Sequence, residues 1–135
     1  MKIVLCLDNS NGMLFGGRRQ SQDRVLRARL LELVGDGKLF LNAYSAKQFE
    51  SDDKLAVSED FLKRAGKDDF CLIENTDIHA EDATMWYLFL WNRDYPGDRR
   101  FTVDLKANGF HRVHTEQFAG SSHKKITLEV YGRTE

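Results

Sequence analysis

Asp23 and a nearby group of arginines have the clearest potential for chemistry in this chain. A carboxylate such as that of Asp23 can hold an amidine-like edge by two parallel hydrogen bonds. At the start of a helix the same side chain would cap the helix and interact favourably with its dipole, so both interpretations stay open. Guanidinium groups suit phosphate or carboxylate ligands, and they equally suit a solvated helix face. The arginines are Arg18, Arg19, Arg24, Arg27 and Arg29.

A glycine-bearing loop at residues 8–17 precedes Asp23 and follows an apolar segment. Open α/β sheets place ligands at such loops, at the carboxyl end of a strand that leads into a helix. The three glycines match neither a dinucleotide fingerprint nor a P-loop, and they are interpreted as turn residues with positive φ. The loop also contains three consecutive apolar residues, which either pack into the core or form a lid over a ligand. These glycines are Gly12, Gly16 and Gly17, and the apolar residues are Met13, Leu14 and Phe15.

Other reactive side chains lack the spacing of a catalytic or metal-binding motif. Cys6 and Cys71 stand in apolar runs, which favours two buried thiols over a disulfide. The histidines are scattered, without zinc-ligand spacing and without the His-x-His-x-Asp-His motif of ribonuclease Z-type nucleases, so we predict no metal site. Residues 121–123 include two serines and a histidine but no G-x-S-x-G elbow, which favours a hairpin loop. The histidines are His79, His111, His114 and His123.

The composition restricts the classes of function. The formal net charge of −1 provides no general attraction for nucleic acid or membranes. RNA binding would also need stacking aromatics near the arginines, and only Phe15 and Tyr44 qualify, so that signal is weak. No long apolar run predicts a membrane span, and we expect a cytoplasmic protein without a membrane partner. Its oligomeric state is left open.

The pattern of apolar residues predicts one α/β domain over residues 1–135, with a mostly parallel sheet, helices on both faces and a terminal antiparallel hairpin. A helix is expected from Ser21 to Gly35, a short helix from a capping box at Ser45, and a two-turn helix between Ser58 and Gly66. Strands are expected at residues 2–7, 37–42, 54–57, 69–74, 85–91, 111–118 and 124–131.

With these elements in order, nearly the whole chain resembles dihydrofolate reductase. The resemblance lies in the first strand, the Gly12-Met13 loop, the acidic Asp23 near a helix start, and residues 42–45 in place of a Gly-Arg-x-Thr-type motif. It continues in residues 87–101, which are similar to a strand that ends in a Glu-Gly-Asp-x-x-Phe turn, and in the closing hairpin. The resemblance implies that Asp23 binds the pterin's amidine-like edge and assists proton transfer.

The chain departs from that family where the cofactor would bind. The family holds the phosphates of its nicotinamide cofactor with a Gly-Gly pair after a late strand, whereas residues 74–77 here read Glu-Asn-Thr-Asp. Two carboxylates would face a pyrophosphate, and the motif's arginine is replaced by Ala43. We therefore predict that the usual NADPH site is lost, and the cofactor, if any, is unknown.

The sequence thus predicts a small-molecule binding protein of dihydrofolate reductase-like fold. The ligand is expected to be anionic or heteroaromatic and to occupy a cleft between the glycine-bearing loop, the Asp23 helix and residues 44–45. Two alternatives are an NADPH-dependent reductase of a pterin-like substrate, with Asp23 as its catalytic residue, and a non-enzymatic module that binds an acidic partner or RNA through its arginines. The predicted ligand-binding residues are Met13, Phe15, Arg18, Arg19, Tyr44 and Ser45.

Overall fold

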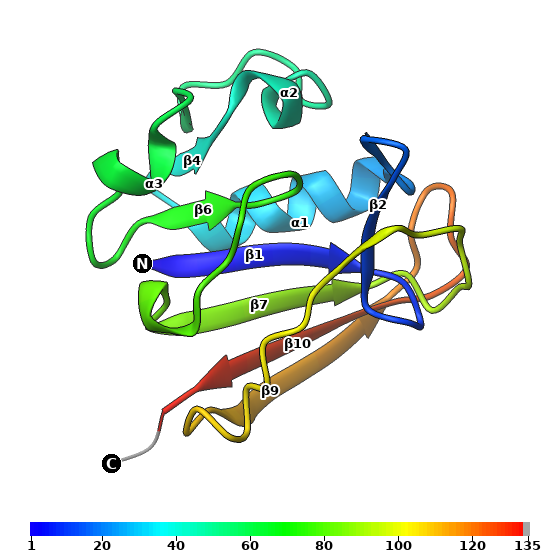
Figure 1. Ribbon diagram of the computed structural model, residues 1–135. Helices are drawn as coiled ribbons and strands as arrows, with labels where there is room; N and C mark the ends of the chain where they lie inside the picture. The colour runs from blue at the N-terminus through cyan, green and yellow to red at the C-terminus, as the bar shows by residue number, and fades with distance from the viewer. Residues whose placement is uncertain (134–135) are drawn as a thin grey trace.

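The computed structural model describes residues 1–133 and is built on a seven-stranded sheet (Figure 1). Five strands run parallel, β10 pairs antiparallel with β7, and β9 pairs antiparallel with β10. This arrangement confirms the predicted mixed, mostly parallel sheet with a terminal antiparallel hairpin. In spatial order the strands are β5 (Leu55–Val57), β4 (Leu39–Leu41), β6 (Phe70–Leu72), β1 (Lys2–Leu7), β7 (Met85–Leu90), β10 (Ile126–Gly132) and β9 (His111–Phe118).

Strand β1 lies in the middle of the sheet and is covered on both faces. Its side chains alternate, so that Ile3 and Leu5 enter one buried cluster and Val4 enters the other, all with no exposed surface. Helix α1 (Arg24–Val34) covers the Val4 face with its buried stripe of Leu26, Leu30 and Val34, spaced as an amphipathic helix requires. The helix ends at Gly35, whose φ of 61° suits glycine at this position, as predicted.

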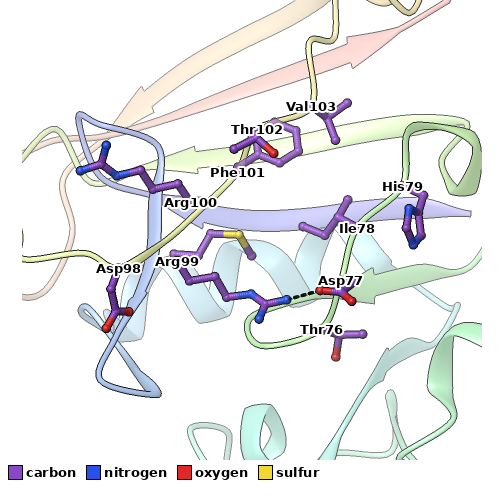
Figure 2. A pocket seen from close by; sticks show the side chains of 11 residues that line it. Thr76, Asp77, Ile78, His79, Asp98, Arg99, Arg100, Phe101, Thr102 and Val103 are labelled. Atoms are coloured by element: carbon purple, nitrogen blue, oxygen red, sulfur yellow. Dashed lines mark hydrogen bonds and ion pairs between the residues drawn. The ribbon is translucent and has the colours of Figure 1, made fainter.

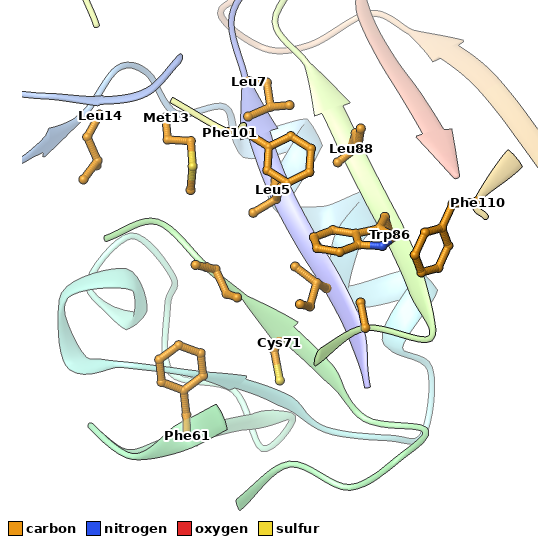
Figure 3. Close-up of a cluster of buried hydrophobic side chains, with 13 residues drawn as sticks. Leu5, Leu7, Met13, Leu14, Phe61, Cys71, Trp86, Leu88, Phe101 and Phe110 are labelled. Atoms are coloured by element: carbon orange, nitrogen blue, oxygen red, sulfur yellow. The ribbon is translucent and has the colours of Figure 1, made fainter. Parts of the chain in front are cut away.

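The opposite face is covered mainly by irregular chain. Helix α3 (Phe61–Arg64) places Phe61 on it, and the 3-10 turn η1 (Ala80–Asp82) follows β6. The segment between β7 and β9 supplies Phe101 and Phe110, whose rings lie 5.4 and 6.0 Å from the Trp86 ring (Figure 3). Helices therefore contribute to both faces, as predicted, but aromatic side chains from loops supply much of the cover on this one.

A second, small sheet stands over the carboxyl end of β1. It contains β3 (Arg18–Arg19), β2 (Gly12–Phe15) and β8 (Arg99–Arg100), in that order. The stretch predicted as a loop is thus partly a hairpin, and Gly16 and Gly17 form its tip with φ of 59° and 76°. Met13 and Leu14 are buried in the core, whereas Phe15 is 53% exposed, so only Phe15 is free of the core.

Three predicted boundaries were wrong for local reasons. Helix α1 is capped by Asp23 and not by Ser21, because the Asp23 carboxylate accepts hydrogen bonds from two backbone N–H groups of the first turn. Helix α2 (Ala43–Ala46) begins before Ser45, because Asn42 directly follows β4 and caps it. Helix α3 has one turn where two were expected. Within residues 1–133, no helix has the length and apolarity needed to cross a membrane.

Candidate functional site

The sheet topology places a crevice at the carboxyl ends of β1 and β6. Helix α1 leaves β1 on one face, and the connection from β6 to β7 crosses β1 on the other, so the strand order reverses here (Figure 1). Ligands of open α/β sheets bind at such points. The crevice holds only about 10 Å³ of free space, hardly enough for one water molecule. Its walls are Cys6, Met13, Arg19, Gln20, Ser21, Ile73, Glu74 and Trp91.

The side chain of Arg19 occupies the crevice and pairs with Glu74. Its Nε and Nη2 donate to the two Glu74 oxygens at 3.0 and 3.1 Å, a bidentate geometry. Its guanidinium lies 4.5 Å from the centre of the Tyr44 ring, and the Tyr44 hydroxyl accepts from the Arg19 backbone N–H at 2.8 Å. Burial lowers the pKa of Arg19, but the hydrogen bond and the charge of Glu74 outweigh that effect and raise it.

Glu74 has a second donor, because Gln48 Nε2 lies 3.2 Å from its Oε1. The Glu74 side chain is 9% exposed and that of Arg19 is 18% exposed. The result is a charged, planar cation held between a carboxylate and an aromatic ring. Chemically, this arrangement can hold a guanidinium or amidine group, and in this structure it holds a side chain of the same protein.

Asp23 lies close by but has no oxygen left for a ligand. Its Oδ1 accepts from the N–H groups of Val25, Leu26 and Ser121, at 2.9, 3.2 and 3.0 Å. Its Oδ2 accepts from the Ser122 N–H at 2.8 Å and lies 3.0 Å from Nδ1 of His123. Burial raises the pKa of Asp23, but these hydrogen bonds, led by that of His123, outweigh it and hold the pKa far below its usual value.

His123 joins Asp23 to two hydroxyl groups. Its Nε2 lies 3.0 Å from Ser21 Oγ and 3.0 Å from the hydroxyl oxygen of Tyr95. The imidazole stacks on Trp91 with ring centres 4.5 Å apart. The pairing of Asp23 with Nδ1 fixes a ring orientation in which Nε2 faces both hydroxyls.

Asp8, immediately after β1, fixes the loops around the crevice. It accepts hydrogen bonds from the backbone of Ser10 and Gly12 at 2.9 and 2.7 Å, and from Gln20 Nε2 and the Tyr95 N–H at 3.2 Å each. Gln20 Nε2 also donates to the Pro96 carbonyl, so this amide orientation is set by two acceptors. The Gln20 carbonyl oxygen is therefore left buried and without a hydrogen-bond partner among the described residues, and Gln20 is one of the residues that line the crevice.

The structure brings some of the predicted ligand-binding residues together and separates others. Arg19 and Met13 line the crevice, and Tyr44 contacts Arg19. Ser45 is buried inside α2, and Phe15 and Arg18 are exposed on the hairpin. The described residues contain no group of three histidines, cysteines or acids that could hold a metal. Burial, together with the charge of Glu74, raises the pKa of the Cys6 thiol well above its usual value, which favours the protonated and less reactive form.

Sequence reasoning missed the roles of Tyr95 and Trp91 and assigned His123 to an ordinary hairpin loop. Trp91 follows the most aromatic strand. The sequence therefore indicated that Trp91 is buried, but it did not indicate that Trp91 lines the crevice. Glu74 was noted only as a carboxylate unfavourable to phosphates. An acid directly after a buried strand was the available signal for its position at the sheet edge.

A wider hollow (Figure 2) shares one lining residue, Met13, with the crevice. It has a volume of about 420 Å³ and lies between the segments 76–79 and 98–103. Across it, Arg99 Nη2 pairs with Asp77 at 2.9 Å, whereas Arg100 points away from that pair. The chain after β6 is irregular as far as η1, so no helix N-terminus faces this hollow from residues 73–79.

Comparison with solved structures identifies the fold as that of dihydrofolate reductase. The chain superimposes on dihydrofolate reductase from Enterococcus faecalis, solved with NADP(H) and RAB-propyl, with a TM-score of 0.64 and 9% sequence identity. The match covers 99% of this chain and 96% of that one. No family model and no curated protein matches the sequence. The expected dihydrofolate reductase-like fold is thereby confirmed, at a sequence identity of only 9%.

Proposed function

We propose that the protein binds a small heteroaromatic ligand with an amidine-like edge, in the place that the Arg19 guanidinium occupies. The observation that carries this proposal is the bidentate Arg19–Glu74 pair stacked on Tyr44. A planar ligand with two parallel N–H donors would make the same hydrogen bonds to Glu74 and the same contact with the ring. The unpartnered Gln20 carbonyl oxygen offers a further acceptor beside it.

Energetics favour this ligand over an anionic one. An anion would have to take Arg19 away from Glu74 and leave a buried carboxylate without its partner, which is costly. An amidine-like ligand instead keeps Glu74 paired, and the long Arg19 side chain can turn toward solvent with its charge. The ligand carboxylate is therefore Glu74 in this proposal, whereas Asp23 keeps all of its hydrogen bonds.

The test is calorimetric titration with benzamidine and 2,4-diaminopyrimidine as probes. Arg19→Ala removes the competing guanidinium, so we expect it to bind at least one probe tenfold or more tightly than the wild type does. Arg18→Ala is the matched control, because Arg18 is exposed on the same hairpin, and its affinity should equal that of the wild type. Glu74→Gln should abolish binding.

A thermal shift separates folding from binding in these variants. Arg19→Ala leaves the Glu74 carboxylate unpaired, so its melting temperature should fall and then recover when benzamidine is added. Equal affinities of Arg19→Ala and Arg18→Ala, together with no recovery, would show that the crevice is not a receptor for this chemistry.

A second candidate is a reductase that acts on such a ligand. It is favoured by the wide hollow next to the crevice, because hydride transfer needs a donor and an acceptor side by side. Two features argue against binding of the usual nicotinamide dinucleotide in this hollow. They are the Asp77 and Asp98 carboxylates and the irregular chain after β6. Titration of NADPH into Arg19→Ala decides this point: one-to-one binding in the micromolar range would support the reductase.

The interaction module remains a third candidate on weaker support. Arg19 is paired with Glu74, and Arg29 is paired with Glu116. The available cations of the arginine group near Asp23 are therefore Arg18, Arg24 and Arg27. Binding of an acidic partner through these side chains would weaken steeply with added salt. An interaction that does not change with salt would exclude it.

A further inference from the structure

We propose that Ser21, His123 and Asp23 form a catalytic triad of nucleophile, general base and orienting carboxylate, and that the crevice hydrolyses small carboxylic esters. This activity goes beyond ligand binding through Glu74. It rests on other residues of the same crevice, and it adds a reaction type that a dihydrofolate reductase-like fold does not by itself suggest.

The connectivity of the three side chains carries the proposal. Ser21 Oγ lies 3.0 Å from His123 Nε2, and His123 Nδ1 lies 3.0 Å from Asp23 Oδ2. A nucleophile, a base and a third group that orients the base, each within hydrogen-bond reach of the next, define the arrangement that activates a serine. The histidine comes from the β9–β10 loop, about 100 positions from the other two, so a local turn does not explain the arrangement.

The base is held rigidly in its working orientation. The imidazole stacks on Trp91, and the Asp23 carboxylate that orients it is itself fixed by backbone N–H groups on both sides. The Asp23 side chain has no exposed surface and that of His123 is 2% exposed, so water does not compete for their hydrogen bond. Such a fixed, charged orienting group stabilises the imidazolium that forms when Nε2 takes a proton.

The nucleophile stands where a ligand would bind. Ser21 is half-buried and lines the crevice together with Arg19 and Glu74, at the edge of the sheet where this topology places ligands. A network that served only to cap α1 would need the Asp23 carboxylate alone, and it would not need a hydroxyl on the crevice wall. The Tyr95 hydroxyl donates to Ser21 Oγ at 3.4 Å and lies 3.0 Å from His123 Nε2, so it would have to turn from these two groups to donate to the oxyanion.

The reaction is an ordinary two-step acyl transfer. Ser21 Oγ attacks the ester carbonyl carbon while its proton passes to His123 Nε2. The carbon–oxygen bond to the leaving alcohol breaks, and the alcohol oxygen takes that proton. Water then attacks the acyl-serine, again with His123 as the base, and releases the carboxylic acid and free Ser21. The small crevice restricts the acyl group to a short one and requires Arg19 to move first.

The test is covalent labelling of the folded protein with a small alkyl fluorophosphonate, followed by peptide mass mapping. The expected result is an adduct on Ser21 that forms at least tenfold faster in Arg19→Ala than in the wild type. Ser21→Ala should form no adduct. Ser122→Ala, an exposed serine next to His123, is the control and should label like the wild type. Burst hydrolysis of p-nitrophenyl acetate should follow the same order.

His123→Gln should slow labelling of Ser21 at least 100-fold while circular dichroism shows a native fold. If that variant does not fold, the pH profile of the wild-type labelling rate replaces it: a sigmoid curve of one titrating group supports the base, and a rate proportional to hydroxide overturns it. The absence of an adduct on Ser21 in both the wild type and Arg19→Ala would also overturn the proposal.

The two proposals about the crevice fail separately. In the Arg19→Ala background, where no guanidinium blocks the crevice, Glu74→Gln should abolish benzamidine binding while the adduct on Ser21 still forms. Ser21→Ala should abolish labelling and leave benzamidine affinity unchanged in the Arg19→Ala background. If either variant lost both benzamidine binding and labelling of Ser21 while it kept the native fold, the two properties would not depend on separate residues.

Discussion

Asp23 and Glu74 are both buried carboxylates beside the same crevice, yet their surroundings differ in one decisive way. The partners of Asp23 are backbone N–H groups and a buried imidazole, all fixed by the fold. The charged partner of Glu74 is a single long side chain that ends in a guanidinium. A rigid set of donors cannot leave, whereas a side chain can turn away.

The difference shows which carboxylate is available for a ligand. The resemblance to dihydrofolate reductases assigns the ligand contact to Asp23, and its cap position was the competing interpretation. The structure places Asp23 at the cap with every oxygen in use, and it leaves Glu74 with a replaceable partner. In the proposed function, the binding carboxylate is therefore the one whose charged partner is a side chain that can turn away, which burial and residue type alone do not indicate.

Removal of the Asp23 carboxylate should have the largest effect on stability. Asp23→Ala leaves several backbone N–H groups and the His123 ring without their acceptor, so we expect a loss of about 3–5 kcal/mol in the free energy of unfolding. Glu74→Gln keeps one acceptor oxygen for Arg19, although its NH2 group would face the other guanidinium N–H, and it should cost less, about 1–3 kcal/mol. Urea denaturation of the two variants measures both values. An equal or smaller loss in Asp23→Ala would break the distinction between a fixed and a replaceable partner.

A methyl group added next to Asp23 should have an intermediate effect. A Cβ on Gly120 would collide with the Asp23 carboxylate and approach Ile126 Cδ1 to 2.9 Å, so Gly120→Ala should cost about 1–3 kcal/mol. Gly132→Ala is the control, because its nearest neighbours lie at an ordinary 3.8 Å. Thermal unfolding should show a lower melting temperature for Gly120→Ala than for Gly132→Ala. Equal melting temperatures would show that the residues around Asp23 can rearrange at little cost in stability.

The half-buried pair of Arg29 and Glu116 extends the comparison to a more exposed setting than that of Arg19 and Glu74, with the smallest expected effect. The Arg29 hydrogen bond, at 2.8 Å, lowers the Glu116 pKa from 4.5 to about 2. The stabilisation from this lowered pKa is complete above pH 4.5 and is lost as the pH falls through 2. Glu116→Gln should therefore cost at most about 1 kcal/mol at pH 7, and less below pH 3. Urea titrations at pH 7 and pH 3 test this, and an equal cost at both would contradict it.

Much of the fold could be predicted because its signals are local. The apolar run of β1, the spacing of Leu26, Leu30 and Val34, and the alternation in β9 each follow from a short window of sequence. The covering of one sheet face by the irregular segment between β7 and β9 was not predicted. Its anchors Phe101 and Phe110 are isolated aromatics in a stretch without periodicity.

The site could be predicted only in part because its contacts span long distances in the sequence. Arg19 and Asp23 were found by position, but their partners Glu74 and His123 lie 55 and 100 residues away. Neither pairing follows from a local pattern. The crevice is closed because side chains leave only about 10 Å³ of free space in it, a property of packing that no motif encodes.

The central position of β1 has a consequence for how the chain is synthesised. Both neighbours of β1 in the sheet are made long after it, β6 at residues 70–72 and β7 at residues 85–90. At about 5–20 residues per second, a nascent chain would carry this apolar strand unpaired for on the order of 10 s. The central strand of the sheet can therefore be paired only after more than half of the chain has been made.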